Sequence, residues 1–215
     1  MLSTLSVLAL GFVLGMRHAT DADHVVVVTT IVSQQRSVAR AAGVGALWGA
    51  GHTATIVLVG GAILLFRVVV PPRLGLAMEF AVAIMLVLLG VRTLRSARGE
   101  PRAAGGSTIR PVVVGFVHGL AGSAFVAMLV LTALDSAIVG IAYLLVFGIG
   151  TVAGMTLVTA AIAVPSAYAV GRVTGAQRYV QLAAGVVSVC FGLLLAHRIG
   201  VIDGLFAATP HWTPQ

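Results

Sequence analysis

The sequence lacks lysine altogether and has few charged residues of any kind. Thirteen arginines and six acidic residues make up only 9% of its 215 residues, whereas a soluble domain carries about 25% charged residues. Hydrophobic residues account for 59% of the chain, and its mean hydropathy is +1.09. A water-facing surface is hard to build from this composition, so the sequence predicts an all-α integral membrane protein.

Cysteine is nearly absent as well. The single Cys190 lies in an apolar run, which excludes an intrachain disulfide and a thiolate cluster for a metal. The net charge of +7 is compatible with nucleic-acid binding, but the arginines stand in short runs between apolar stretches, as membrane topology signals do. We therefore expect a lipid bilayer around the chain and no nucleic-acid partner.

Six apolar stretches follow one another along the chain, and each is long enough for the roughly 20 residues that cross a bilayer as a helix. We expect spans at residues 4–32, 42–66, 75–96, 111–133, 137–163 and 178–199. The hydrophilic stretch between the third and fourth spans divides the chain in two. The predicted units are a three-helix repeat at 1–97, a cytoplasmic linker at 98–110, and a second three-helix repeat with a short tail at 111–215.

The arginines are distributed unequally between the two sides that six spans would create. One side receives Arg36, Arg40, Arg92, Arg95, Arg98, Arg102, Arg110, Arg172 and Arg178, and the other receives Arg67, Arg73 and Arg198. An arginine excess marks the cytoplasmic side. The sequence therefore predicts a multi-pass protein of the plasma (inner) membrane with both termini on the extracytoplasmic side.

The two halves resemble each other weakly, in the same order and at nearly constant offsets. Because each half holds three spans, the second half enters the membrane upside down, which is the inverted repeat of many secondary transporters. Within this alignment His52 corresponds to Thr151, so the ionisable chemistry is concentrated in the first half. The matching segments are 11–16 with 115–120, 48–59 with 147–158, and 88–94 with 190–196, at offsets of 104, 99 and 102.

Five polar or ionisable side chains interrupt the first apolar stretch: Arg17, His18, Asp21, Asp23 and His24. An ionisable group at the bilayer centre costs at least about 2.5–3.5 kcal/mol, so these groups must face protein, water or an ion. On an ideal helix His18, Asp21 and His24 share an arc of roughly 120°, and Asp23 points away. The two histidines would then lie about 9 Å apart along the axis. Either the helix unwinds near residues 19–22, or Asp21 is shared between two successive ion positions.

Imidazole and carboxylate together suit borderline divalent ions such as Ni(II), Co(II), Zn(II) and Fe(II), whereas Cu(I) prefers sulfur ligands. His52 in the second span stands beside two glycines that allow a close approach of the first helix, so it is a further ligand candidate. Asp23 either binds the ion on an unwound helix or orients a histidine. The competing interpretation is a buried salt-bridge network. The predicted metal residues are His18, Asp21, Asp23, His24 and His52.

Further residues are candidates for the ion pathway or for supporting the ligands: Arg17, Thr53, His118, Ser123 and Thr151. Arg17 is expected to pair with one of the two aspartates rather than to touch the ion. His118 has the equal alternative of a hydrogen bond between helices. Ser123 near His118 raises the idea of an intramembrane hydrolase, but ordinary small-residue packing explains that segment better, and we predict no enzyme activity.

One acidic residue outside this group needs an interpretation of its own. Glu79 lies near the outer end of the third span. Its simplest roles are neutralisation of Arg73 or a place in the membrane interface, and metal ligation is the weaker alternative.

The segment RHATDADH matches the H-x-x-x-x-D-H signature of the nickel/cobalt permease family through His18, Asp23 and His24. The segment GHTATIV resembles the G-H-S-[TS]-V-V segment of that family through Gly51 and His52. The resemblance implies that the signature lies on a transmembrane helix and is needed for transport of Ni(II) or Co(II).

The chain also departs from the typical members of that family. They have eight spans and an L-G-F-D-T-A-T-E motif, and the corresponding VFGIGTVAGM at residues 146–155 lacks both acids. With six spans and VHGLAGSA at residues 117–124, the chain is more similar to the shorter urease-accessory branch of the same superfamily. This resemblance covers nearly the whole chain. Because the wider group includes importers and exporters, the direction of transport does not follow from it.

The sequence as a whole predicts a permease for divalent transition metal ions, nickel first and cobalt second, that works by alternating access. The ion is cargo, and no cofactor is expected. The chain has no G-x-x-x-x-G-K-[ST] motif for ATP, so an ion gradient, the membrane potential or a partner must supply the energy. The alternatives are a non-transporting accessory protein for metal delivery or sensing, and an exporter of the same fold. A homo-oligomer or a metal-delivery partner is compatible with each of them.

Overall fold

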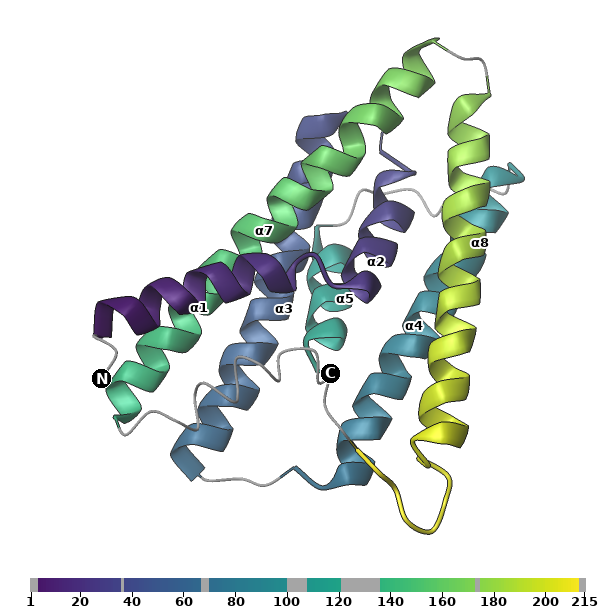
Figure 1. Cartoon of the computed structure of the whole chain (residues 1–215). Helices are drawn as coiled ribbons and strands as arrows, with labels where there is room; N and C mark the ends of the chain where they lie inside the picture. Colours follow the sequence, from purple (N-terminus) through teal and green to yellow (C-terminus); the bar gives the residue numbers. More distant parts are fainter. Residues whose placement is uncertain are drawn as a thin grey trace.

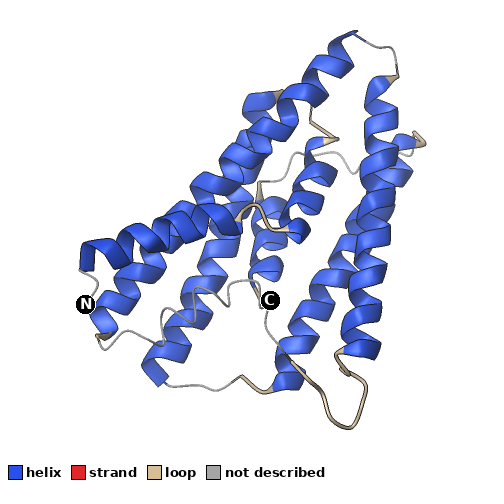
Figure 2. Ribbon diagram, in the orientation of Figure 1, coloured by secondary structure: helices blue, strands red, loops and turns tan. Residues whose placement is uncertain are grey.

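The computed structural model describes residues 4–35, 37–66, 70–99, 108–120, 136–172 and 175–212. Within these ranges the regular elements are all helical and no strand occurs (Figure 2). The elements are α1 (Thr4–His18), α2 (Ala22–Val32), α3 (Val38–Phe66), α4 (Pro72–Ala97), α5 (Ile109–Gly119), α7 (Ala137–Arg172), α8 (Ala176–His197) and a π-helical turn η2 (Arg198–Ile202), arranged as in Figure 1.

Four stretches are long and apolar enough to cross a membrane: α3, α4, Ala137–Tyr168 of α7, and Ala176–Ile202. They coincide with four of the six predicted spans. The first predicted span corresponds to two shorter apolar helices, α1 and α2, and the fourth begins as α5 and continues outside the described residues. The predicted all-helical, membrane-like character is thus confirmed for the described residues, and the number of six spans stays a prediction.

The first predicted span is broken at the polar cluster. Helix α1 ends at His18 and α2 begins at Ala22, and the chain between them changes direction (Figure 1). Asp21 adopts an extended conformation, with φ −60° and ψ 148°. The amides of Thr20 and Asp21 still donate to the carbonyls of Arg17 and His18, at 2.8 and 3.1 Å. Of the two alternatives left by the sequence, local unwinding is the one observed.

Glycines let the helices around this break approach backbone to backbone. A methyl group at Gly15 of α1 would overlap the carbonyl oxygen of Phe147 in α7. A methyl group at Gly51 of α3 would overlap the carbonyl oxygen of Val112 in α5. Small residues that permit such contacts are typical of helix packing in membranes. They hold α1, α3, α5 and α7 close together.

The contact between α3 and α7 is reciprocal. A Cβ at Gly49 of α3 would lie 3.1 Å from the Cα of Val152 in α7, and one at Gly148 of α7 would overlap the side chain of Thr53 in α3. The two glycines, and the two residues they face, are separated by the same offset of 99 residues as the matching sequence segments 48–59 and 147–158. The two helices therefore offer each other equivalent faces.

Helices α4 and α8 form a second reciprocal pair. A Cβ at Gly90 of α4 would lie 2.7 Å from a methyl carbon of Val189, and one at Gly192 of α8 would lie 2.8 Å from a methyl carbon of Val87. Both pairs follow the offset of 102 residues. This pair stands beside the group of α1, α3, α5 and α7, and α2 contacts both, as Figure 1 shows.

The end of the chain packs back onto the start of α4. Trp212 covers Gly75 and donates its indole N–H to Glu79 at 2.9 Å. Arg73 donates to the carbonyl oxygen of Ala207 at 3.1 Å. The predicted neutralisation of Arg73 by Glu79 is therefore wrong: tail residues distant in the sequence supply the partners of both side chains.

Candidate metal centre

Four buried histidines converge at the break between α1 and α2. His18 ends α1, His24 lies in the first turn of α2, and His52 and His118 lie in α3 and α5. The ring centroid of His24 lies 4.5, 4.9 and 4.4 Å from those of the other three, in that order. None of the four is more than 6% exposed. Side chains from four helices thus form one compact cluster of imidazoles.

Three of these histidines form a group that is able to hold an ion. His18, His24 and His52 each offer a ring nitrogen, and these nitrogens lie within 4.8 Å of one another. The Nε2 atoms of His18 and His52 are 2.9 Å apart. Ligand nitrogens about 2.1 Å from a metal and at right angles to each other are separated by roughly the same distance. This spacing suits either an N–H···N hydrogen bond or two adjacent ligands of one ion.

Two carboxylates form hydrogen bonds with the histidines of this cluster. His18 donates Nδ1–H to Asp21 at 2.8 Å, and His24 donates Nδ1–H to Asp23 at 2.9 Å. Because a neutral imidazole carries one N–H, each bond leaves Nε2 as the nitrogen with a free lone pair. A carboxylate behind a metal-binding histidine orients the ring and raises its basicity. The two aspartates are thus placed to aim their histidines.

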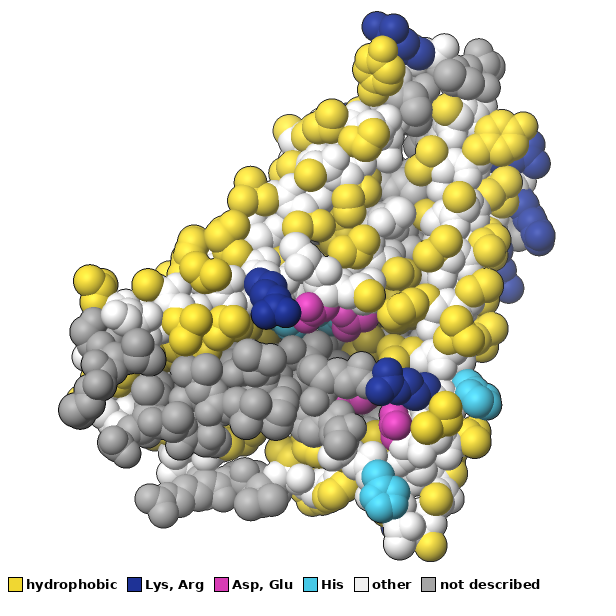
Figure 3. Space-filling model, in the orientation of Figure 1, with side chains coloured by type: hydrophobic (Ala, Val, Ile, Leu, Met, Phe, Trp, Pro, Cys, Tyr) yellow, Lys and Arg dark blue, Asp and Glu magenta, His cyan; other side chains and the backbone are white. Residues whose placement is uncertain are grey.

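The break in the helix makes this arrangement possible. Asp21 occupies the position that precedes α2, where an aspartate often caps the helix, but its side chain makes no capping bond. It bonds to His18 of the preceding helix instead. On an unbroken helix Asp23 would point away from His18 and Asp21, whereas here it joins the cluster. Figure 3 shows acidic side chains beside a basic one in the middle of a mostly hydrophobic face.

Asp23 also joins α2 to α5. Its second carboxylate oxygen accepts Nε2–H of His118 at 2.9 Å, from a residue 95 positions along the chain. Asp23, His24 and His118 form a second group whose ligand atoms lie within 4.8 Å of one another. The interhelical hydrogen bond expected as one interpretation of His118 is therefore observed. His118 also stands in a group of residues able to hold an ion, and its role in an ion pathway stays a prediction.

Several ring nitrogens of the cluster are buried without a partner. In the described part of the chain, Nε2 of His24, Nδ1 of His52 and Nδ1 of His118 form no hydrogen bond. Buried polar groups are nearly always hydrogen-bonded in proteins, and an exception calls for a specific reason. A cluster that existed only to hold helices together would satisfy these atoms.

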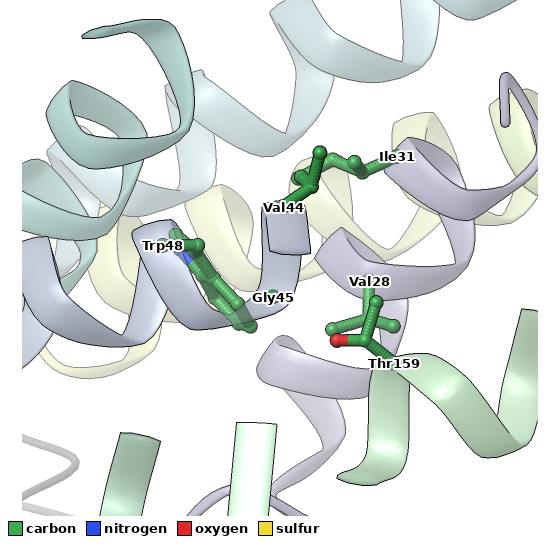
Figure 4. Close-up of a pocket in the computed structure, with 6 residues that line it drawn as sticks. All are labelled: Val28, Ile31, Val44, Gly45, Trp48 and Thr159. Carbon is green, nitrogen blue, oxygen red and sulfur yellow. The ribbon is translucent and has the colours of Figure 1, made fainter. Parts of the chain in front are cut away.

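Two aromatic residues that the sequence analysis did not single out enclose the cluster. The ring of Phe147 lies 5.7 Å from His18, and that of Trp48 lies 5.4 Å from His24. Trp48 also lines a small apolar pocket without room for a water molecule, drawn in Figure 4 with Val28, Ile31, Val44, Gly45 and Thr159. Trp48 stands four residues before His52 and therefore on the same face of the helix. This spacing is the sequence signal that places Trp48 beside the histidine cluster.

The other residues predicted for the ion pathway differ in their surroundings. Arg17 is exposed, and none of the ion pairs among the described residues joins it to an aspartate, so its predicted pairing is wrong. Thr53 and Thr151 donate their hydroxyls to backbone carbonyls of α7, at 3.2 and 3.0 Å. Ser123 lies outside the described residues. Roles in transport for these residues stay predictions.

Comparison with known proteins places the chain in a family. Neither a protein-family model nor a solved structure matches it. A curated relative, the urease accessory protein UreH of Bacillus sp. (strain TB-90), is 33% identical over 218 residues, which covers 94% of this chain and 95% of the relative. At this identity over nearly the full length of both proteins, the chain belongs to the family of the urease accessory protein UreH.

Proposed function

We propose that this protein is a permease for divalent transition metal ions, with nickel as the first cargo and cobalt as the second. The observation that carries the proposal is the convergence of His18, His24 and His52, two of which have a carboxylate behind them. Neutral imidazoles suit borderline divalent ions. The resemblance to nickel/cobalt permeases and the kinship with a urease accessory protein both favour nickel.

The charge of the cluster also suits a dication. Asp21 and Asp23 together carry two negative charges, and the histidines bind an ion in their neutral form. An ion that enters is therefore neutralised within an apolar part of the protein, where an unbalanced charge is costly. The buried nitrogens without partners favour this proposal over a purely structural salt-bridge network.

The packing of the helices supports a transport mechanism with two related halves. The reciprocal contacts between α3 and α7 and between α4 and α8 follow the offsets of the sequence repeat. Such reciprocity is expected where a pseudo-two-fold axis relates two inverted three-helix units. We propose six spans, both termini outside the plasma membrane, and alternating access in which one unit moves against the other around the ion.

The membrane potential is sufficient to drive import in this scheme. Two positive charges that move inward gain about 4.6 kcal/mol per 100 mV, which corresponds to a concentration ratio of more than a thousandfold. No ATP-binding partner is then required.

A second candidate is a membrane accessory protein that binds nickel for delivery without moving it. The name of the relative, a urease accessory protein, is the observation that favours it. Binding would be the same in both cases, so only net movement of the ion separates them. Export instead of import would appear in the same assay as a dependence on the opposite gradient.

The test is nickel accumulation by proteoliposomes under an imposed potential, with cobalt, zinc and iron in parallel. The wild type should accumulate nickel, and His18→Ala should not. His197→Ala is the matched control, because this exposed histidine lies at the end of α8, away from the cluster. Binding of nickel without accumulation of any of the four ions would reject the permease and leave the accessory role.

A further inference from the structure

The two metal-capable groups share one residue, and this sharing suggests how the ion moves. On the basis of the proposed function, we propose that the ion occupies two successive positions linked by His24. The first position uses His18, His24 and His52, and the second uses Asp23, His24 and His118. The second position would be a metal site in its own right, with one carboxylate and two imidazoles.

The ligand atoms of the second position already lie within 4.8 Å of one another. The two oxygens of Asp23 face Nδ1 of His24 and Nε2 of His118, each at 2.9 Å. At present an N–H lies in each of these contacts. An ion that replaced the two protons would meet one oxygen and two nitrogen ligands, a set suited to nickel and cobalt.

His24 is unable to serve both positions at once. A neutral imidazole carries one proton and offers one lone pair. In the first position His24 binds through Nε2 and keeps its proton on Nδ1, bonded to Asp23. In the second position it binds through Nδ1 and must carry the proton on Nε2. A single ion therefore alternates between the two positions, and His24 exchanges tautomers as the ion passes.

The protons of this exchange have defined destinations. In His24 the proton moves from Nδ1 to Nε2, and in His118 it moves from Nε2 to Nδ1, so neither ring changes its charge. The two receiving atoms are among the buried nitrogens that lack a hydrogen-bond partner in the described ranges. A purely structural network does not explain why these two nitrogens lack partners. Transfer of the ion from the first to the second position, called the handover below, needs both of them to accept a proton.

The handover also connects the two halves of the chain. The ligands that the ion leaves, His18 and His52, lie on α1 and α3 of the first half. Of the two ligands that it gains, Asp23 lies on α2 of the first half and His118 lies on α5 of the second half. A movement of one half against the other would change the distance between these ligands. In this proposal, the conformational change of alternating access would drive the exchange of ligands between the first and the second position.

Cobalt binding to the purified protein in nanodiscs tests the second position without any need for transport. The variant His52→Leu, which puts an apolar side chain of similar size in place of the imidazole, removes a ligand of the first position only. We expect it to bind one Co(II) with an altered visible spectrum and an affinity reduced about 10–100-fold. Adding His118→Gln should abolish the remaining binding. Loss of all binding in His52→Leu alone, with the variant still folded by circular dichroism, would overturn the proposal.

The single variant His118→Gln separates ligation from hydrogen bonding. Glutamine also donates an N–H to Asp23 but is a poor nickel ligand. We expect equilibrium binding within about threefold of the wild type, because the first position is intact, and nickel accumulation reduced at least about tenfold. Wild-type accumulation would identify His118 as a structural partner only. A wild type that binds without accumulating would reject the permease, and the cobalt spectra would still decide on the second position.

Discussion

The substitution Asp21→Asn measures how much the carboxylate that bonds to the proposed ligand His18 contributes to nickel affinity. Asp21 accepts Nδ1–H of His18 at 2.8 Å, and an asparagine oxygen of the same shape can accept the same bond. The variant therefore changes the charge while the ring retains a partner. An ion held about 2.1 Å from Nε2 of His18 would lie roughly 6–7 Å from the carboxylate, across the imidazole ring.

The distance sets the size of the effect. The side chain of Asp21 is 43% exposed, so a water-like dielectric constant applies, and the attraction between a dication and this carboxylate is about 1.3 kcal/mol. That alone weakens binding about tenfold. The lower basicity of His18 beside a neutral amide adds to it, so we expect an affinity for nickel reduced by about 10–100-fold.

Isothermal titration calorimetry with nickel in nanodiscs provides the assay. Asp203→Asn is the matched control, since it removes the same charge from a carboxylate that pairs with Arg198 at 3.8 Å, and its affinity should equal that of the wild type. An unchanged affinity in Asp21→Asn would refute the contribution of the negative charge on Asp21 to ion binding. A loss of more than about a thousandfold, well beyond the range for a supporting carboxylate, would mean that Asp21 itself binds the ion.

Three further outcomes follow from the same geometry. Gly51→Ala should lower the unfolding free energy by about 1–3 kcal/mol in thermal melts, because its methyl group meets a backbone carbonyl of α5, whereas Gly43→Ala on the same helix has open space and should be neutral or stabilising. Nickel should quench the fluorescence of Trp212→Phe, whose remaining Trp48 contacts the cluster, and should leave that of Trp48→Phe nearly unchanged. Nickel affinity should fall as the solution is acidified, because a protonated imidazole has no lone pair for the ion; an affinity that stays constant through the whole acid range in which the protein remains folded would argue against histidine ligands.

The sequence was sufficient to find the polar centre because its residues are out of place in a hydrophobic chain. His18, Asp21, Asp23 and His24 stand within seven positions of one another, and His52 stands beside glycines. The cost of such groups in lipid does not depend on tertiary structure, so their need for a special environment was predictable. Four of the predicted spans were likewise predictable, because length and hydropathy define a spanning helix.

The partners of these residues were not predictable from local pattern. The bond between Asp23 and His118 joins residues 95 positions apart, and the bond between Glu79 and Trp212 joins residues 133 positions apart. Helix periodicity places residues on faces of one element but does not say which element packs on that face. For Asp23 the ideal-helix argument applies only to an unbroken helix, and α2 begins just before this residue.

The position of the break follows from charges that the sequence already contains. Arg17 and His18 stand in the last turn of α1, and Asp21 and Asp23 stand at the start of α2. Cations favour the C-terminus of a helix and anions its N-terminus, because of the helix dipole. The order of charges in RHATDAD therefore favours two helices over one, and it was a signal for the break in the sequence itself.

The charged residues at the break between α1 and α2 favour two separate helices and also bond to the proposed ligands. Ion binding at the proposed site would therefore alter the stability of this part of the fold. Asp23 lies in the first turn of α2, where its negative charge interacts favourably with the helix dipole. It also accepts hydrogen bonds from His24 and His118. An ion that takes over Asp23 as a ligand removes both of these hydrogen bonds while it supplies a positive charge between the helices. In the proposed mechanism, movement of the ion would therefore change the forces between α2 and α5 directly, and occupancy of the site would be linked to a rearrangement of the proposed halves without a separate sensor.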